Sequence, residues 1–314
     1  MEKTESVLEI RGISKEYEGK FVLNNVSLTI PQGHCYGILG ENGAGKSTLY
    51  RIVSGKAKAT YGSILVDGAD ITKSSLARSR VFCSGDGMYF PERIKLYGIL
   101  KIMKNLSAFD YCYADLLLRN FGISSHKRFG QLSRGERSLF GAILALASKA
   151  DFIILDEPVL GVDLNSREVF YKELAKQVAK EEKTYIVTTH LIDEIQDLLE
   201  YVAVLRMGEV VAEGKTEEVV GQAVAISGPS EKVEDATENL EVIRDERFAG
   251  YRHRVVYIPD DGIDLEKLCD AFEIEVRPVD LETVFKALNT GRMKKILTGR
   301  SDSKNGDSGR KAVR

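Results

Sequence analysis

The sequence predicts an α/β protein with a central, mostly parallel sheet, and three observations lead to this prediction. Residues 34–39 are a short apolar run that leads through a glycine-rich loop into the helical pattern of residues 47–53. Residues 152–155 and 184–189 are further largely apolar runs, typical of strands buried on both faces of a parallel sheet. The amphipathic pattern of residues 164–182 predicts a helix between those two strands. Alternation of strands and helices is typical of an α/β fold.

The glycine-rich loop fits the phosphate-binding pattern G-x-x-x-x-G-K-S. Its glycines allow successive backbone N–H groups to point at phosphate oxygens, and the helix that follows places its positive end beneath the anion. Lys46 is a point charge for the β- and γ-phosphates, and Ser47 offers a hydroxyl to Mg²⁺. The alternative, a glycine-rich turn that binds nothing, is disfavoured by the strand and helix on either side. The candidate phosphate-binding residues are Gly40, Glu41, Asn42, Gly43, Ala44, Gly45, Lys46, Ser47 and Thr48.

Two acidic residues and a histidine are predicted at the same edge of the sheet. Asp156 and Glu157 follow the strand at 152–155, where open α/β sheets place their ligands. We expect Asp156 to bind a metal ion, because hard cations take oxygen ligands, and Glu157 to polarise a water for attack on a γ-phosphate. His190 follows the strand at 184–189 and is predicted to orient that water. Without a phosphate loop nearby, turn, cap or structural roles are commoner for such residues.

Two weaker candidates lie elsewhere in the chain. Ser133 and Gly135 are predicted at the start of the helix that follows residue 137, where free N–H groups and a hydroxyl make a second anion site. Taken alone, this pattern indicates an ordinary helix cap. Tyr17 is predicted in a loop before the second strand, where its ring could stack on an adenine face. An exposed tyrosine at a sheet edge is the commoner case.

Composition limits the classes of function. The chain has 314 residues, of which 43% are hydrophobic and 29% charged, so it can form a large folded domain and a smaller one. The net charge of −3 argues against a dedicated nucleic-acid binder. The four cysteines show no paired spacing and are expected to be reduced thiols without a metal. Residues 1–5 are charged with no apolar segment behind them, so no signal peptide is expected, and the best apolar run, 140–147, is too short to span a membrane.

The C-terminal third is predicted to form a small α+β unit. Strand and helix patterns between residues 223 and 277 follow the order βαββαβ, with a turn at 228–229 and a helix at 264–272, which suggests a ferredoxin-like fold. A helix at 279–288 would close this unit. Residues 292–314 hold eight Lys and Arg against two Asp, lack periodicity and are expected to be a disordered basic tail.

The motifs together resemble those of the ATP-binding cassette (ABC) ATPases over about residues 5–220. The phosphate loop is followed, in family order, by residues 132–136, which are similar to the LSGGQ signature, then by residues 153–158, residues 161–163 and His190. The resemblance implies a P-loop NTPase cassette with a mostly parallel central sheet and an antiparallel β subdomain. It also implies a helical insert at about 90–145, and ATP and Mg²⁺ as cofactors. We expect a cassette at 1–220, an accessory domain at 221–291 and the tail at 292–314.

The same resemblance implies a partner for the site. Two cassettes, identical or different, would dimerise head to tail, with each ATP between the phosphate loop of one copy and the signature helix of the other. Ser133, Gly135 and Glu136 would then contact the nucleotide of the partner, and Asp163 would cross the interface. Within one copy, Glu157 would act as general base with the aid of a histidine.

A membrane role follows from the same family resemblance. Hydrolysis would drive a separate integral membrane permease, and the chain would lie peripherally on the cytoplasmic face of the cell membrane, without a nucleic-acid partner. The C-terminal extension resembles those of multi-component exporters, which implies export of a drug, a peptide or a lipid-like substrate.

One departure from the family pattern keeps alternatives open. The glutamine that the family carries after the second sheet is absent, since no Gln occurs between Gln32 and Gln131, and Ser84 stands in its place. A soluble ABC ATPase acting on DNA or the ribosome is one alternative. It is disfavoured by the short spacing from Lys46 to Ser133 and by the single cassette. An ATP-binding regulator with weak hydrolysis is the other.

Overall fold

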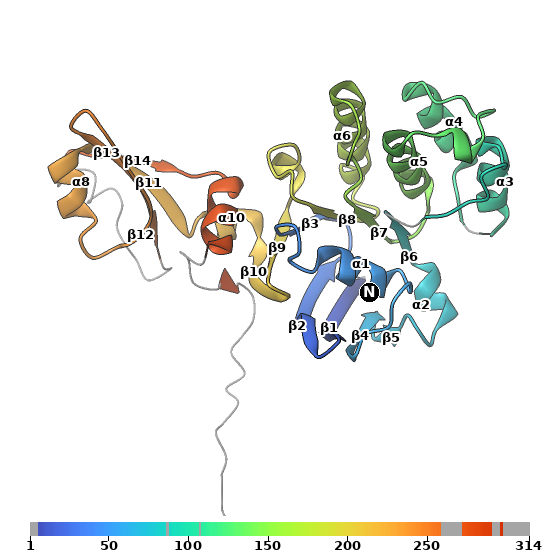
Figure 1. Cartoon of the computed structure of the whole chain (residues 1–314), viewed down its shortest axis with the longest axis horizontal. Coiled ribbons are helices and arrows are strands. Elements are labelled where there is room, and N and C mark those ends of the chain that lie inside the picture. The colour runs from blue at the N-terminus through green and yellow to red at the C-terminus, as the bar shows by residue number, and fades with distance from the viewer. Residues whose placement is uncertain (1–5, 86–87, 107, 259–271, 291–295, 298–314) are drawn as a thin grey trace, which may run out of the picture.

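The computed structural model describes residues 6–85, 88–106, 108–258, 272–290 and 296–297, and Figure 1 shows their arrangement. A seven-stranded sheet lies at the centre, and two four-stranded sheets accompany it. In spatial order the central sheet consists of β15 (Ile296–Leu297), β10 (Glu209–Lys215), β9 (Tyr201–Arg206), β3 (Cys35–Leu39), β8 (Thr184–Thr189), β7 (Phe152–Asp156) and β6 (Val81–Ser84).

The central sheet is parallel from β6 through β7, β8 and β3 to β9. The carboxyl ends of these strands therefore meet at one edge, which is where the sequence places its candidate site residues. β10 is joined to β9 by the turn at Met207 and Gly208 and pairs with it in the antiparallel sense. The predicted α/β class and the predicted strands at 34–39, 152–155 and 184–189 are confirmed.

An antiparallel sheet and α1 (Lys46–Val53) pack on one face of the central sheet. Alternating buried positions on β1 and β2, such as Leu8 and Leu28, meet Leu49 of α1 in one apolar core. The chain turns directly after β4, where Asp67 and Gly68 both have positive φ, as a tight hairpin turn requires. The antiparallel sheet consists, in spatial order, of β2 (Lys20–Pro31), β1 (Val7–Tyr17), β4 (Tyr61–Val66) and β5 (Ala69–Asp70).

Helices cover the opposite face and extend beyond the sheet (Figure 1). Within the insert that the family resemblance implies at about 90–145, the chain turns between two helices, α3 (Leu96–Leu106) and α4 (Tyr111–Asn120). Asp110 caps the second helix by accepting a hydrogen bond from the backbone N–H of Tyr113 at 2.9 Å. The helix predicted to end at residue 182 ends at Val178. The helices on this side are α3, α4, α5 (Arg134–Ala147) and α6 (Leu164–Val178), and α2 (Ser75–Ser79) precedes β6.

The third sheet is antiparallel and is built from the C-terminal region. The predicted turn at 228–229 is wrong, because both residues extend β11 and pair with Arg252 and Tyr251. The helix predicted at 264–272 lies almost entirely outside the described residues, and the domain boundaries at 220 and 291 remain predictions. The sheet order is β12 (Glu241–Phe248), β13 (Tyr251–Tyr257), β11 (Ala223–Pro229) and β14 (Glu275–Pro278), with α8 (Ser230–Ala236) packed against it.

Two elements connect this third sheet to the cassette. α10 (Leu281–Asn289) packs its apolar side chains into the core shared by β9, α7 (Thr216–Val220) and the third sheet. Arg206 of β9 donates a hydrogen bond to the carbonyl oxygen of Leu288 at 2.5 Å. β15 pairs in parallel with β10, so the expectation of disorder over 292–314 is wrong at residues 296–297. The rest of that segment lies outside the described residues.

Among the described helices, none combines the length and the apolar character that crossing a membrane requires.

Candidate nucleotide site

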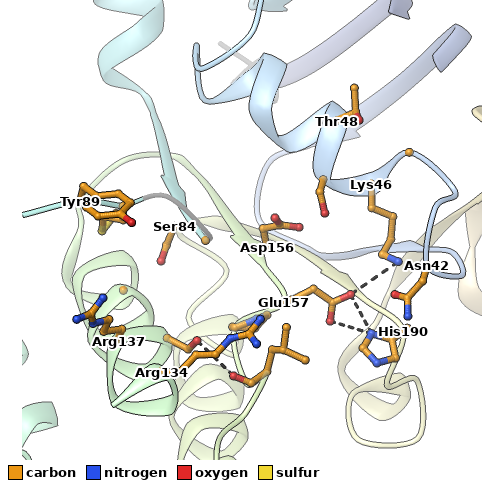
Figure 2. Close-up of a pocket in the computed structure, with 18 of the residues that line it drawn as sticks. Asn42, Lys46, Thr48, Ser84, Tyr89, Arg134, Arg137, Asp156, Glu157 and His190 are labelled. Atoms are coloured by element: carbon orange, nitrogen blue, oxygen red, sulfur yellow. Dashed lines mark hydrogen bonds and ion pairs between the residues drawn. The ribbon is translucent and has the colours of Figure 1, made fainter. Parts of the chain in front are cut away.

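A cleft of about 730 Å³ opens at the carboxyl edge of the central sheet. Figure 2 shows the labelled side chains that face it from several separate elements. The phosphate loop lines one side, and the first turns of α5 line the other. Between them lie the ends of β6 and β7 and the residue that follows β8. The cleft therefore brings together segments of the sequence that are more than a hundred residues apart.

The phosphate loop has the backbone that its glycines permit. Gly43 and Gly45 have φ angles of 87° and 110°, a region in which side chains other than glycine are strained. A Cβ on Gly45 would also lie 2.6 Å from Cδ2 of Leu23, so this position must be glycine on two counts. α1 begins at the next residue and has no side-chain cap, so its first N–H groups are available to an anion in the loop.

Lys46 lies at the centre of the cleft and is only 5% exposed. Its Nζ donates to the carbonyl oxygen of Gly40 at 2.5 Å and to that of Glu41 at 3.3 Å, and it lies 3.7 Å from Oε1 of Glu157. Burial lowers the pKa of Lys46, while the carboxylates of Glu157 and Asp156 act against that shift. The lysine is therefore a buried donor whose neighbours are two carbonyl oxygens of the phosphate loop and the carboxylate of Glu157.

Asp156 ends β7 and is 6% exposed. The hydroxyl of Thr188, on the neighbouring strand β8, donates to its Oδ1 at 2.5 Å. Gly85 packs so closely that a Cβ there would lie 2.5 Å from the Cβ of Asp156. These contacts hold the carboxylate in one orientation, and sequence reasoning did not find Thr188. Carboxylate and hydroxyl oxygens suit Mg²⁺, and Asp156 and Ser47 both line the cleft.

Glu157 is the first residue after β7 and has a left-handed backbone, with φ of 46°. Its backbone N–H donates to the carbonyl oxygen of Thr188 at 3.0 Å, which fixes this unusual conformation. The Nδ1 atom of His190 lies 3.0 and 3.1 Å from its two carboxylate oxygens (Figure 2). Because a carboxylate can only accept, the Nδ1 atom of His190 carries the proton. The structure thus brings Lys46, Glu157 and His190 into one contacting group.

The start of α5 is stabilised within the chain by a capping box. The Ser133 hydroxyl accepts from the N–H of Glu136 at 3.2 Å, and the Glu136 carboxylate accepts from the N–H of Ser133 at 2.8 Å. Glu136 also accepts from Lys127 at 2.8 Å. Although partial burial raises it, the pKa of Glu136 is lowered overall by the hydrogen bonds from Lys127 and Ser133. Its carboxylate is therefore already engaged inside its own chain.

Gly135 lies against the turn that precedes α6. A Cβ on Gly135 would overlap the carbonyl oxygen of Gly161, so only glycine allows this approach. Asp163 caps α6 by accepting from the N–H of Ser166 at 3.0 Å, and this hydrogen bond lowers its pKa. Ser133, Gly135, Glu136 and Asp163 do not line the cleft that holds Lys46, and their contact with a partner's nucleotide remains a prediction.

Other residues lie where the sequence did not place them. Tyr17 was expected in a loop, but it is the last residue of β1, 43% exposed, and does not line the cleft. Ser84 ends β6 and faces the cleft, and a Cβ on Gly141 would lie 2.6 Å from its Oγ. Tyr89, Arg134 and Arg137 also line the cleft and were not predicted. For Arg134 the available signal was its place inside residues 132–136, where the LSGGQ signature has a glycine.

A phosphate loop beside a carboxylate pair and a histidine, at the carboxyl edge of a parallel sheet, defines the class of P-loop nucleotide-binding proteins. A family model described as ABC transporter matches residues 23–160. The chain is 33% identical over 208 residues to the ABC transporter ATP-binding protein NatA of Bacillus subtilis, covering 62% of this chain and 82% of NatA. It is 30% identical over 191 residues to YtrB of the same organism, covering 60% of this chain and 65% of YtrB.

A third relative is the Nod factor export ATP-binding protein I of Rhizobium johnstonii, which is 31% identical over 224 residues, 69% of this chain and 72% of that protein. The solved structure of an ATP-binding subunit of an ABC transporter aligns with a TM-score of 0.62 at 23% identity, over 69% of this chain and 92% of that one. The chain belongs to the ABC transporter family, among its ATP-binding proteins.

Proposed function

We propose that this protein hydrolyses ATP and, as one of two cassettes in a dimer, drives a separate membrane permease that exports its substrate. The contact of Glu157 with both Lys46 and His190 carries this proposal, because it places a candidate base beside the lysine of the phosphate loop. Family membership and the export role in the name of the Nod factor relative support it.

The phosphate loop is the proposed binding site of the triphosphate. The N–H groups at the start of α1 and the Nζ of Lys46 would bind the β- and γ-phosphates, which would replace the loop carbonyls as partners of the lysine. Ser47 and Asp156 would hold Mg²⁺, which neutralises charge on the phosphates. Thr188 would keep Asp156 oriented by its hydrogen bond. Beyond binding this charge, the site would act mainly by positioning the attacking water and the γ-phosphate.

Glu157 is the proposed general base. Its carboxylate faces the cleft and would accept a proton from the water that attacks the γ-phosphate. His190 would hold the carboxylate in place through the hydrogen bond from its Nδ1 atom, and in this role it positions the base. The Nζ atom of Lys46 lies 3.7 Å from Oε1 of the same carboxylate, so the base and the lysine of the phosphate loop face one bound group.

The start of α5 is the proposed contribution of a second copy. Ser133 uses its oxygen as an acceptor inside the capping box, so its O–H remains able to donate to a phosphate of the partner's nucleotide. Gly135 and the helix N-terminus would approach the same anion. Glu136, whose carboxylate accepts a hydrogen bond from Lys127, would contact the same nucleotide. Asp163 would contact the partner across the interface.

The permease would be a separate chain beside which this protein lies on the cytoplasmic face of the membrane. Its transported substrate would be a drug, a peptide or a lipid-like molecule. Co-purification of the full chain with an integral membrane protein from detergent-solubilised membranes tests this partner. Recovery of the chain on ribosomes alone would contradict a transport role.

The substitution Glu157→Gln tests hydrolysis. We expect steady-state Mg-ATP turnover to fall by about 10² or more, the size typical of losing a general base. ATP binding should persist, and a nucleotide-dependent dimer should accumulate in light scattering, because ATP is no longer consumed. The matched control is Glu168→Gln, since Glu168 lies on the exposed side of α6, and its turnover should stay within about twofold. Unchanged turnover in the Glu157 variant would refute the base assignment.

A further inference from the structure

Two segments carry the candidate base and its histidine, and they are tied together at one end. The first segment is the turn of residues 157–163, and the second is the loop of residues 190–194. Glu157 begins the first and His190 begins the second, and their side chains are in hydrogen-bond contact at 3.0 Å. The distance between them therefore depends on how the two segments lie relative to one another.

The turn 157–163 is itself a compact unit. The N–H of Leu160 donates to the carbonyl oxygen of Glu157 at 3.2 Å, and that of Val162 donates to Val159 at 3.1 Å. Val159 and Val162 are both buried in the main apolar core. Hydrogen bonds within the turn and the burial of its two valines therefore fix the backbone from Glu157 to Val162.

Arg167 forms a second tie between the same two segments. From the first turns of α6, its Nε donates to the carbonyl oxygen of Val162 at 2.9 Å, and its Nη1 donates to Oε1 of Glu194 at 2.6 Å. One planar guanidinium thus holds the last part of the turn and the end of the histidine loop at once. The backbone N–H of Arg167 also donates to the carbonyl oxygen of Asp163 at 3.0 Å.

The surroundings of Glu194 make this tie specific. Its second oxygen, Oε2, is buried, as is the hydroxyl of Tyr171, one helical turn after Arg167 on α6. Burial, and then the negative charge of Glu194, raise the pKa of Tyr171. A carboxylate in this position needs a cation, and Arg167 supplies it. The ion pair is three-quarters buried on both sides, unlike the exposed pair of Glu168 and Lys172 on the same helix.

We propose that Arg167 and Glu194 are positioning residues, which fix the approach of His190 to Glu157 by clamping the turn 157–163 to the loop 190–194. This inference rests on the proposed function, in which Glu157 acts on bound ATP.

The substitution Arg167→Ala in the full chain gives the first test. We expect kcat for Mg-ATP to fall about tenfold, because small misplacements of a base are costly, while KM and direct ATP binding change by less than about twofold. Arg167→Lys keeps the charge but lacks the planar guanidinium that donates to both Val162 and Glu194, and we expect it to recover less than half of the lost rate. Full recovery by lysine would show that charge alone matters and would overturn the clamp.

A second test separates positioning from general stabilisation. In a His190→Ala background, Arg167→Ala should lower kcat by less than about twofold, since the histidine it positions is gone. If the kcat losses of the two single variants multiplied in the double variant, the proposal would be overturned, because a structural defect elsewhere acts independently of His190. Glu168→Gln, which breaks the exposed neighbouring pair, is the matched control and should leave kcat within about twofold.

A third variant covers the case in which Arg167→Ala fails to fold. Glu194→Gln retains the volume of the side chain and an oxygen acceptor, and we expect it to lower kcat several-fold with an unchanged circular dichroism spectrum. Wild-type turnover in Glu194→Gln would overturn the proposal. Failure of the proposed function would look different, because the wild-type chain itself would then show no turnover above that of Lys46→Ala.

Discussion

The residues of the cleft and the residues at the start of α5 differ in how completely one chain satisfies them. In the cleft, Lys46 and His190 both contact Glu157, and all three side chains line open space. At the start of α5, Ser133 and Glu136 satisfy each other in a capping box, and neither lines the cleft that holds Lys46. The comparison teaches that the proposed nucleotide-binding and base groups all lie within one copy, while the helix start proposed to meet a second copy is already capped by its own chain.

The largest effect is expected at the cleft. Lys46→Ala should weaken ATP binding by about a hundredfold or more, roughly 3 kcal/mol, because a buried charged donor to the phosphates is lost. Isothermal titration calorimetry with ATP measures this change in affinity. Lys172→Ala removes an exposed lysine of α6 and should leave the affinity unchanged within about twofold. Equal affinities of wild type and Lys46→Ala would place the nucleotide elsewhere.

A smaller effect is expected where α5 meets the turn before α6. Gly135→Ala places a Cβ against the carbonyl oxygen of Gly161, so unfolding free energy should fall by about 1–3 kcal/mol. Turnover should fall as well, while ATP binding persists. Denaturant titration and an ATPase assay check both. Gly98→Ala is the control, because its Cβ would touch only the Ile94 side chain at 3.5 Å, and it should not destabilise α3.

Ser133 sharpens the comparison most directly. Ser133→Ala should cost about 1 kcal/mol of stability through the lost cap and lower turnover about tenfold, with ATP binding intact. Ser133→Thr keeps a hydroxyl and the cap, and should retain most of both. If Ser133→Ala turned over ATP at the wild-type rate, the capped helix would have no part in a shared site.

The smallest effect concerns the capping box and its pH dependence. Glu136 has a folded pKa below its ordinary value of 4.5, so its contribution to stability is present above about pH 4.5 and is lost as the pH falls through the folded pKa. Glu136→Gln should therefore lower the free energy of unfolding by a few tenths of a kcal/mol at pH 7, since the pair with Lys127 is partly exposed. Below that pH the difference from wild type should shrink. A difference that grew on acidification would contradict the capping role.

Short-range patterns allowed the sequence to predict much of the cassette. The glycine loop, the acids after β7 and the histidine after β8 each follow a strand, so their meeting at one edge follows from a parallel sheet alone. The tie between Arg167 and Glu194 could not be predicted, because it joins side chains 27 residues apart through a carbonyl oxygen of a turn.

The errors have local causes. Tyr17 belongs to β1 because irregular pairing with β2 carries that strand on to the turn at Gly19. Pro229 was read as a turn residue, but it ends β11, a position in which its missing N–H is tolerated. The left-handed backbone of Glu157 depends on a hydrogen bond to the carbonyl oxygen of Thr188 on β8, and the residues next to Glu157 in the sequence do not indicate it.

The packing of α10 has a consequence for any motion of the cassette. This helix is inserted into the same apolar core as β9 and the third sheet, and Arg206 donates a hydrogen bond to the carbonyl oxygen of Leu288 near its end. If two copies close on nucleotide and reopen as proposed, the third sheet would move together with the central sheet as one rigid body. A spectroscopic label on the exposed ring of Phe248 or Tyr251 would then report that movement.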